Sequence, residues 1–235
     1  MPAGILSGRV SVLVDATVGI DVGGARKGFH AVAFTGGAYA SQLASADVQE
    51  LAHWCRSVVR ASVIAIDAPC RWSRDGRMRS CERELIGRGI SCFASPTRQR
   101  AVEHPTSYFG WMLQGEALYQ ALENGAAEQA YPLVRSLPPS GPGCFETFPH
   151  AITWHLRGGQ AKAAQKRLQR RELLAQAGLD LTPLTNIDWI DAALCALTAH
   201  VVATGGECVS YGEPESGLIV VPRGHDWGPF PTLTP

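Results

Sequence analysis

The chain has 235 residues, of which 46% are hydrophobic and 18% are charged, as is ordinary for a soluble globular protein. Its 21 basic residues equal its 21 acidic residues, so it lacks the overall positive field expected of a general nucleic-acid coat protein. The seven cysteines are scattered and include no C-x-x-C pair, which argues against a disulfide framework or a cysteine zinc site.

The cysteine pattern favours a reducing compartment. The sequence shows neither a signal-peptide pattern nor an apolar run of about eighteen residues. We therefore expect a cytoplasmic protein without a membrane partner. The sequence assigns no oligomeric state.

The first part of the chain is predicted to be rich in strands. Residues 17–22, 27–34 and 38–43 have strand patterns and are joined by glycine-containing turns short enough for antiparallel hairpins. Asp47 is a candidate N-cap for a helix that runs to about Arg60. The next strand must be reached by a crossover if it is to lie parallel to the first.

That next strand is apolar and covers residues 62–67. The later segments are predicted in this order: an arginine-rich loop and helix after residue 70, a mostly helical stretch at 104–129, a proline-rich connection at 132–142, a strand at 143–149, helices at 150–157, 162–177 and 186–204, and extended pieces at 207–211 and 218–221. We predict one α/β domain over 17–222, with an extension at 1–16 and a tail at 223–235.

Two aspartates stand at the ends of predicted buried strands. Asp21 ends VGID, and Asp67 ends VIAID two residues before Pro69. If the strands are parallel neighbours, their axes lie about 4.8 Å apart, and the two carboxylates meet at one edge of the sheet. Such charges repel unless a cation lies between them, and a divalent cation with oxygen ligands would satisfy both. Each aspartate could instead cap a turn or the following helix.

Further acidic residues could join this pair. Strand alternation places Glu146 on the face of Cys144 and Phe148, where a charge needs a partner or a metal unless the strand is at an edge. Asn186 is a candidate N-cap of the last long helix, and Asp188 in its first turn suits the helix dipole. Asp191 falls on the margin of the apolar stripe of that helix, so a functional role is favoured for it.

These elements together resemble the ribonuclease H-like superfamily. Its pattern has three hairpin strands with an aspartate on the first, an aspartate at the end of the fourth strand, and D-x-x-D at the start of a late helix. More closely, the chain resembles the predicted nucleases of domain of unknown function 429 from about Val18 to Pro222. The segments that carry this resemblance are IDVGGARKG, IDAPCRW, RDGRMRSCERELIGRGISCFASPTR, FETFPHA, the helix with Lys166, Arg170 and Arg171, DWIDAALCALTA and GLIVVP.

The resemblance implies a ribonuclease H-like fold, with a mixed five-stranded sheet of three antiparallel hairpin strands followed by parallel strands, flanked by helices. It implies a nuclease that hydrolyses phosphodiester bonds of a nucleic acid or nucleotide by a two-metal mechanism with Mg²⁺ or Mn²⁺. The catalytic and metal-binding acids implied are Asp21, Asp67, Glu146 and Asp191, with Asp188 as a further metal ligand.

Basic residues are concentrated locally, with eight arginines against three acidic residues between Cys70 and Arg100. Candidates for phosphate contacts are Arg26, Lys27, Arg71, Arg74 and Lys166. Most of the basic residues are explained as well by solvated helix faces and intramolecular ion pairs.

Aromatic and histidine residues give weaker signals. Trp72 and Trp111 are candidates for stacking on a base, although packing in the core or at its rim explains them better. We predict a structural role for His30.

Two other functions are compatible with the sequence. One is a phosphotransferase or ATPase of the actin-like superfamily, since IDVGG is similar to the first phosphate hairpin of those proteins, although the chain is short for their duplicated core. The other is a non-catalytic binding module of the same fold that retains the acidic residues.

Overall fold

The computed structural model of the protein describes residues 16–125 and 130–224. Its centre is a seven-stranded mixed sheet in the order β3-β2-β1-β4-β5-β7-β6. The strands are β1 (Ala16–Val22), β2 (Phe29–Thr35), β3 (Ala38–Ser45), β4 (Val63–Asp67), β5 (Gly143–Glu146), β6 (Cys208–Glu213) and β7 (Gly217–Pro222). The first three strands form antiparallel hairpins, and β4, β5 and β7 continue the sheet parallel to β1.

The sheet has seven strands, so the prediction of a five-stranded sheet was wrong. The pieces near 207–211 and 218–221 pair with each other as the antiparallel hairpin of β6 and β7. Strand β7 also lies beside β5, with Ile219 opposite Glu146. All six residues of β7 are buried, so this strand must be covered on both faces and has its place inside the sheet rather than at its edge.

The helices agree with the predicted order but not with every predicted boundary. They are α1 (Val48–His53) with the π-helical continuation η1 (Trp54–Val59), α2 (Ser80–Gly87), α3 (Arg98–Val102), the short 3₁₀ helix η2 (Ser107–Phe109), α4 (Gly110–Glu123), α5 (Pro149–Leu156), the 3₁₀ helix η4 (Ala163–Gln165), α6 (Lys166–Gln176) and α7 (Ile187–Ala203). The stretch predicted as one helix at 104–129 contains η2 and α4, and its last residues lie outside the described chain. So do most of the predicted N-terminal extension and C-terminal tail. No helix among the described residues is long and apolar enough to span a membrane.

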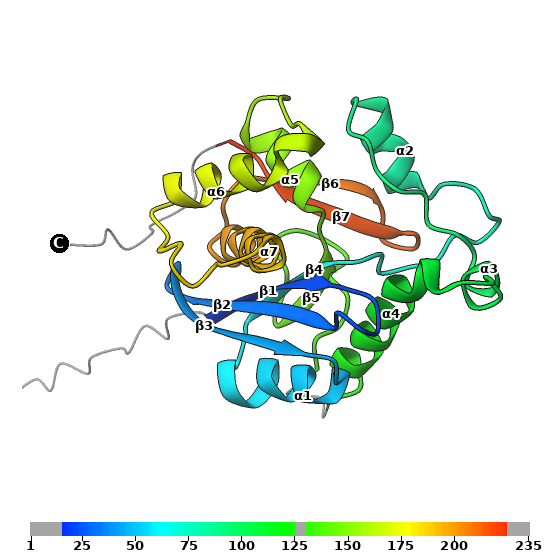
Figure 1. Cartoon of the computed structure of the whole chain (residues 1–235), viewed down its shortest axis with the longest axis horizontal. Helices are drawn as coiled ribbons and strands as arrows, with labels where there is room; N and C mark the ends of the chain where they lie inside the picture. The colour runs from blue at the N-terminus through cyan, green and yellow to red at the C-terminus, as the bar shows by residue number, and fades with distance from the viewer. Residues whose placement is uncertain (1–15, 126–129, 225–235) are drawn as a thin grey trace, which may run out of the picture.

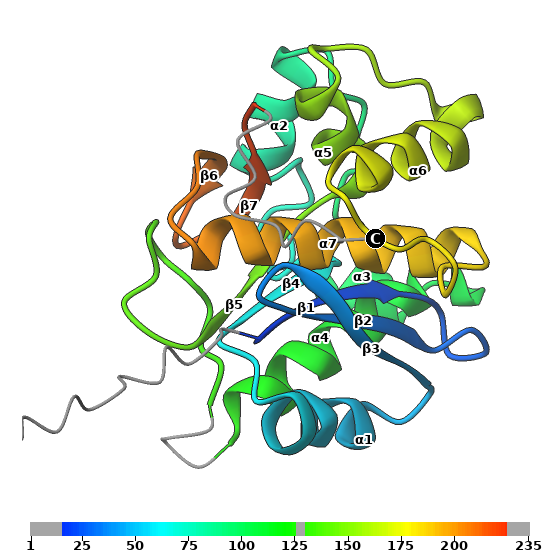
Figure 2. The same ribbon diagram turned by 90° about the vertical axis from the view of Figure 1, so that its left-hand side faces the viewer.

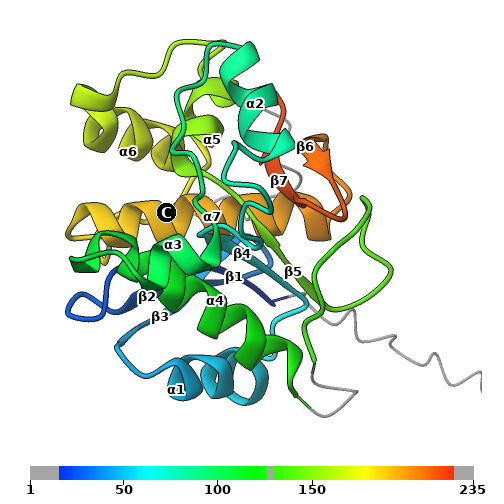
Figure 3. The ribbon, with the colours of Figure 1, turned by 90° about the vertical axis from the view of Figure 1, so that its right-hand side faces the viewer.

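Helices cover both faces of the sheet (Figure 1). Helix α7 crosses one face, and α1 and α4 lie on the other, as the two side views also show (Figures 2 and 3). Alternation along β1 sorts its residues between these layers: Val18 and Ile20 belong to the apolar core that includes residues of α1 and α4. Gly19 faces α7.

Helix α7 lies against the backbone of β1 at Gly19. A Cβ atom on this residue would be 1.9 Å from the backbone nitrogen of Ala196 and 2.1 Å from the carbonyl oxygen of Ala192. Asn186 begins the helix, as predicted, because its Oδ1 accepts hydrogen bonds from the backbone nitrogens of Asp188 at 2.9 Å and Trp189 at 3.0 Å. These contacts fix both the height of α7 above the sheet and the point where it starts.

We expect Gly19→Ala to destabilise the protein by at least about 3 kcal/mol, because the methyl group would meet backbone atoms that can move only if α7 shifts. Gly87→Ala is the matched control, since a Cβ there meets nothing within 4 Å and the residue is helical. The control should be neutral or stabilising by up to about 1 kcal/mol. Urea denaturation measures both changes, and equal effects of the two variants would contradict the close contact.

Candidate functional site

Asp21 and Asp67 are direct neighbours in the sheet. Strands β1 and β4 pair in parallel, and Asp21 is the register partner of Asp67. Register partners in adjacent parallel strands point to the same face of the sheet, and their strands are about 4.8 Å apart. Two residues earlier on each strand, Gly19 and Ala65 pack against α7. The aspartate pair therefore lies at the carboxyl ends of the strands, on the side of the sheet that α7 covers.

Asp191 joins this pair from α7. It is 7% exposed and forms a buried ion pair with Arg170 of α6. Burial raises the pKa of Asp191 to about 6, and the Arg170 guanidinium acts in the opposite direction. The charges of Asp21 and Asp191 both act on Asp67, so the three acids share one electrostatic environment.

Lys27 connects Asp21 with Asp188. Its Nζ lies 3.2 Å from Oδ2 of Asp21 and 2.7 Å from Oδ1 of Asp188. The turn between β1 and β2 folds back tightly, because the backbone nitrogen of Lys27 donates a hydrogen bond to the Gly24 carbonyl at 2.8 Å. Burial acts to lower the pKa of Lys27, but the two carboxylates outweigh it and raise that pKa. The ammonium group thus neutralises part of the acidic cluster from within.

His30 is a further potential ligand at this place. It is the register partner of Asp21 across the β1–β2 hairpin, and one ligand atom each from Asp21, His30 and Asp188 lie within 4.8 Å of one another. Its buried Nδ1 has no hydrogen-bond partner among the described residues. Its ring packs against Trp189 in an edge-to-face arrangement, with centroids 4.6 Å apart. The sequence predicts only a structural role for His30. Counting outward from the Gly23–Gly28 turn pairs Val22 with Phe29 and Asp21 with His30, and this count is the signal that could have placed His30 at the site.

Asp67 differs from the other aspartates of the cluster. Within the described residues its carboxylate forms no hydrogen bond or ion pair. Burial raises its pKa well above the usual value, and the charges of Asp21 and Asp191 raise it further. A carboxylate in this position is relieved either by a proton or by a bound cation.

Glu146 has its own partner. Its oxygens accept two hydrogen bonds from the Arg79 guanidinium, at 2.7 and 2.8 Å, and one from the Cys70 nitrogen at 2.9 Å. Arg79 also bonds Glu82 through Nε at 2.8 Å, and all three charged side chains are almost completely buried. The structure therefore places Glu146 in a separate ion-pair network beside the aspartates, and it would have to exchange a partner to bind a metal.

The basic residues proposed for phosphate binding are mostly at the surface. Arg26, Arg71, Arg74 and Lys166 are exposed. Arg71 donates a hydrogen bond to the backbone carbonyl of Cys70 at 3.4 Å, and Arg74 donates one to that of Glu215 at 3.2 Å. The charge of Lys166 acts on Asp191, which places this lysine beside the cluster. Lys27 is within the cluster itself.

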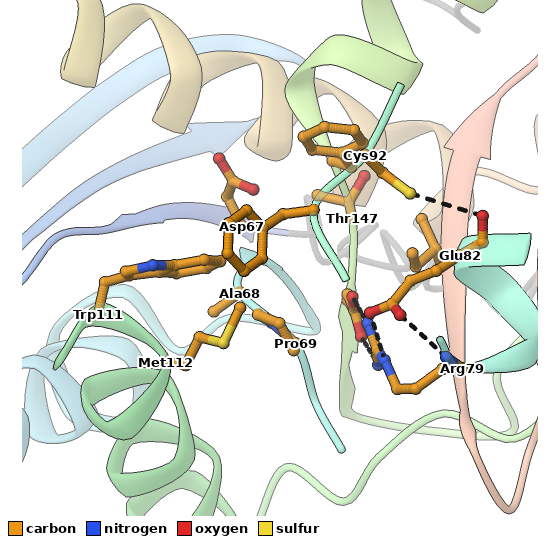
Figure 4. A pocket seen from close by; sticks show the side chains of 13 residues that line it. Asp67, Ala68, Pro69, Arg79, Glu82, Cys92, Trp111, Met112 and Thr147 are labelled. Atoms are coloured by element: carbon orange, nitrogen blue, oxygen red, sulfur yellow. Dashed lines mark hydrogen bonds and ion pairs between the residues drawn. The ribbon is translucent and has the colours of Figure 1, made fainter. Parts of the chain in front are cut away.

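A cavity of about 60 Å³ adjoins the cluster and begins at Asp67 (Figure 4). Asp67 and Trp111 lie at one side of it, and Arg79 and Glu82 at the other. The site as a whole therefore combines an acidic cluster, a cavity beside it and basic residues on the surrounding surface.

The fold and this site define a mixed α/β protein that gathers acidic side chains where parallel strands end beneath a long helix. A family model described as a protein of unknown function, DUF429, matches residues 19–216, and the chain belongs to this family. The resemblance drawn from the sequence is thereby confirmed at the level of the family. No curated protein and no solved structure matches the chain.

We expect Asp67→Asn to stabilise the metal-free protein at neutral pH. The folded protein keeps the Asp67 proton at pH values where the unfolded chain, with a pKa of 3.8, has released it. The native state is thus penalised increasingly as the pH rises above about 4, and asparagine removes this penalty. The expected gain in the free energy of unfolding is largest at neutral and higher pH, where the unfolded chain is fully ionised. Urea denaturation should show the gain shrinking as the pH falls below about 4, and a loss of stability at neutral pH would contradict the repulsion.

Arg79→Met should destabilise the protein strongly, because it leaves the buried carboxylates of Glu146 and Glu82 without their cation. We expect a loss of about 3 to 5 kcal/mol. The control is Arg98→Met, which removes an ion pair with Glu116 from an arginine that is 60% exposed. Its loss should stay below about 1 kcal/mol. Similar losses in denaturant titrations of the two variants would rule out a special role for the Arg79 network.

Proposed function

We propose that this protein is a divalent-metal-dependent nuclease of the ribonuclease H-like superfamily that hydrolyses phosphodiester bonds in the presence of Mg²⁺ or Mn²⁺. The observation that carries the proposal is the in-register pairing of Asp21 with Asp67, with Asp191 of α7 acting on the same carboxylates. The arrangement of three antiparallel strands followed by parallel ones supports it.

The donor set fits a hard divalent cation. Carboxylate oxygens suit Mg²⁺ and Mn²⁺, and the Asp67 carboxylate is unpartnered within the described residues. When all four are ionised, Asp21, Asp67, Asp188 and Asp191 carry four negative charges, against which Lys27 and Arg170 place two positive charges. The two charges left over equal the charge of one divalent cation. A second ion of the two-metal mechanism would need Lys27 to leave its place between Asp21 and Asp188.

In this proposal Asp21, Asp67 and Asp191 hold the metal, with Asp188 and His30 as further ligands at the hairpin side. Bound ions would supply the Lewis acid and the activated water for attack on phosphorus. Arg26, Arg71, Arg74 and Lys166 are placed to contact the phosphates of a nucleic acid or nucleotide from the surrounding surface. Glu146, held by Arg79, supports the wall of the site.

One observation favours a second candidate, a non-catalytic binding module. Lys27 and Arg170 already neutralise Asp21 and Asp191, so the cluster is largely satisfied without a metal. Metal binding distinguishes the two candidates, because a non-catalytic module whose acidic residues are already paired with Lys27 and Arg170 is not expected to bind a divalent cation. Hydrolysis of ATP without any cleavage of nucleic acid would instead favour an actin-like phosphotransferase.

Isothermal titration with MnCl₂ tests the metal site directly. We expect binding by the wild-type protein, and at least a tenfold loss of affinity in Asp67→Asn because the unpaired carboxylate is gone. The affinity should rise between about pH 5 and pH 7.5, since Asp191, with a pKa of about 6, must release its proton to accept a cation. The same substitution should abolish Mn²⁺-dependent cleavage of a labelled oligonucleotide.

The matched control for this titration is Asp75→Asn, which changes an exposed aspartate whose partners lie in its own loop. It should bind Mn²⁺ as the wild type does. Undetectable binding to the wild-type protein at millimolar Mn²⁺, or equal binding by Asp67→Asn, would refute the metal site.

A further inference from the structure

The cavity beside Asp67 has a wall made largely of aromatic and apolar side chains. Phe93, Trp111, Met112 and Phe148 line it, and Asp67 is part of the same lining. The Trp111 side chain extends toward Asp67 in Figure 4. Whatever occupies this cavity therefore lies next to the acidic cluster.

The polar groups of the cavity are mostly engaged with one another. Arg79 is bound to Glu82 and Glu146, and the Thr147 hydroxyl donates to the Val220 carbonyl at 2.7 Å. Few hydrogen-bonding groups remain for a ligand, so recognition here depends on contact with ring faces and apolar atoms. A flat, uncharged ring fits this chemistry better than a sugar or a phosphate does.

The aromatic lining continues onto the surface. Phe93 is 44% exposed and Tyr108 is 56% exposed, and their ring centroids are 5.8 Å apart. Trp111 lies 6.5 Å from Phe93 in an edge-to-face arrangement. Exposed rings of this kind are typical stacking platforms for bases, because every base has a π-face. Isolated exposed apolar side chains need no explanation, but a contiguous cluster beside a cavity does.

The size of the cavity limits what can enter. At about 60 Å³ it is far below the roughly 300 to 1,000 Å³ of sites that enclose a drug-sized ligand. A whole nucleotide would not be enclosed, whereas the edge of one base could enter while its face rests on Phe93. The exposed Arg71 and Arg74 lie on the same segment as Phe93, residues 70–100, which has eight arginines and three acidic residues.

We propose that Phe93 and Trp111 form a binding site for one unpaired nucleobase, which stacks on Phe93 at the mouth of the cavity. This inference rests on the proposed function, in which a phosphodiester is hydrolysed at the metal site of Asp67. It specifies which class of nucleic acid is the substrate. Bases in a duplex are stacked on their neighbours and cannot offer a free face, so the substrate is single-stranded nucleic acid or an unpaired end or loop.

Fluorescence anisotropy in EDTA measures base binding without cleavage and without the metal. The probes are labelled oligothymidine of eight nucleotides, an RNA single strand of the same length, an abasic strand of the same length, and a duplex. We expect both strands that carry bases to bind at least tenfold more tightly than the abasic strand and the duplex. Equal binding of the abasic strand and oligothymidine would overturn the proposal, because phosphate contacts alone would then explain the affinity.

Variants at the exposed ring assign the effect to the site. Phe93→Ala should weaken binding of oligothymidine by about 5- to 100-fold and leave the abasic strand unaffected, whereas Phe93→Trp should preserve binding. Val58→Ala, which truncates an exposed apolar residue of η1, is the control and should change nothing. Unchanged binding by Phe93→Ala, in a protein with a wild-type melting curve, would refute the site.

The outcome is separable from that of the metal titration. Mn²⁺ binding and cleavage without base-dependent affinity would leave the nuclease proposal standing and remove this one. Base-dependent affinity without metal binding would keep the stacking site on a single-strand binding module.

Discussion

The parallel pairing of β1 with β4, pressed from above by α7, is the constraint on which the site depends. Gly19 lets the helix backbone approach the strand to within van der Waals contact, and this approach brings Asp191 down to the level of the strand ends. The register of the two strands then places Asp21 beside Asp67. A larger residue at position 19 or a shift of one residue in register would separate these carboxylates, because register and helix height are set by the same packing.

Electrostatic repulsion in this cluster is reduced by two basic residues from different parts of the chain. Lys27 arrives on the β1–β2 turn, Arg170 on α6, and each holds an aspartate that the sheet or α7 supplies. The positive charges are unevenly distributed over the cluster. Among the four aspartates, only Asp67 lacks a contact with a basic side chain within the described residues. Neutralisation by fixed cations stabilises the fold, and the same cations compete with any ion that the site would bind. Folding and metal binding are therefore opposed at this place in the molecule.

Much of this arrangement could be predicted from the sequence, for physical reasons that are specific to each element. The apolar runs that end in Asp21 and Asp67 predict buried strands, and the short glycine turns predict the hairpins. Asn186 predicts the start of α7, where its side chain indeed caps the first turn. Family membership was also predicted correctly from the quoted segments.

The remaining features depend on contacts between distant segments. The pairing of Glu146 with Arg79 joins residues 67 positions apart, and nothing near Glu146 in the chain announces a buried arginine. The β6–β7 hairpin joins the sheet through β5, a neighbour remote in sequence, so the local strand pattern does not predict that it belongs to the sheet. The position of His30 opposite Asp21 follows from the spacing about the hairpin turn, but its nearness to Asp188 depends on where α7 starts above the sheet.

The anchoring of the segment around Phe93 has a kinetic consequence. The Glu82 carboxylate accepts hydrogen bonds from the backbone nitrogens of Arg79 at 2.9 Å and Ser95 at 3.1 Å. The Cys92 thiol donates to the backbone carbonyl of Glu82 at 3.5 Å. The backbone is thus held on both sides of Phe93 and tied through Arg79 to the sheet. This wall cannot swing as a flap without breaking the hydrogen bonds of Cys92 and Ser95 to Glu82, so the motion left at the mouth of the cavity is rotation of the exposed rings. Such rotations take picoseconds to nanoseconds, which means that arrival of a ligand by diffusion, rather than opening of the protein, sets the rate of entry.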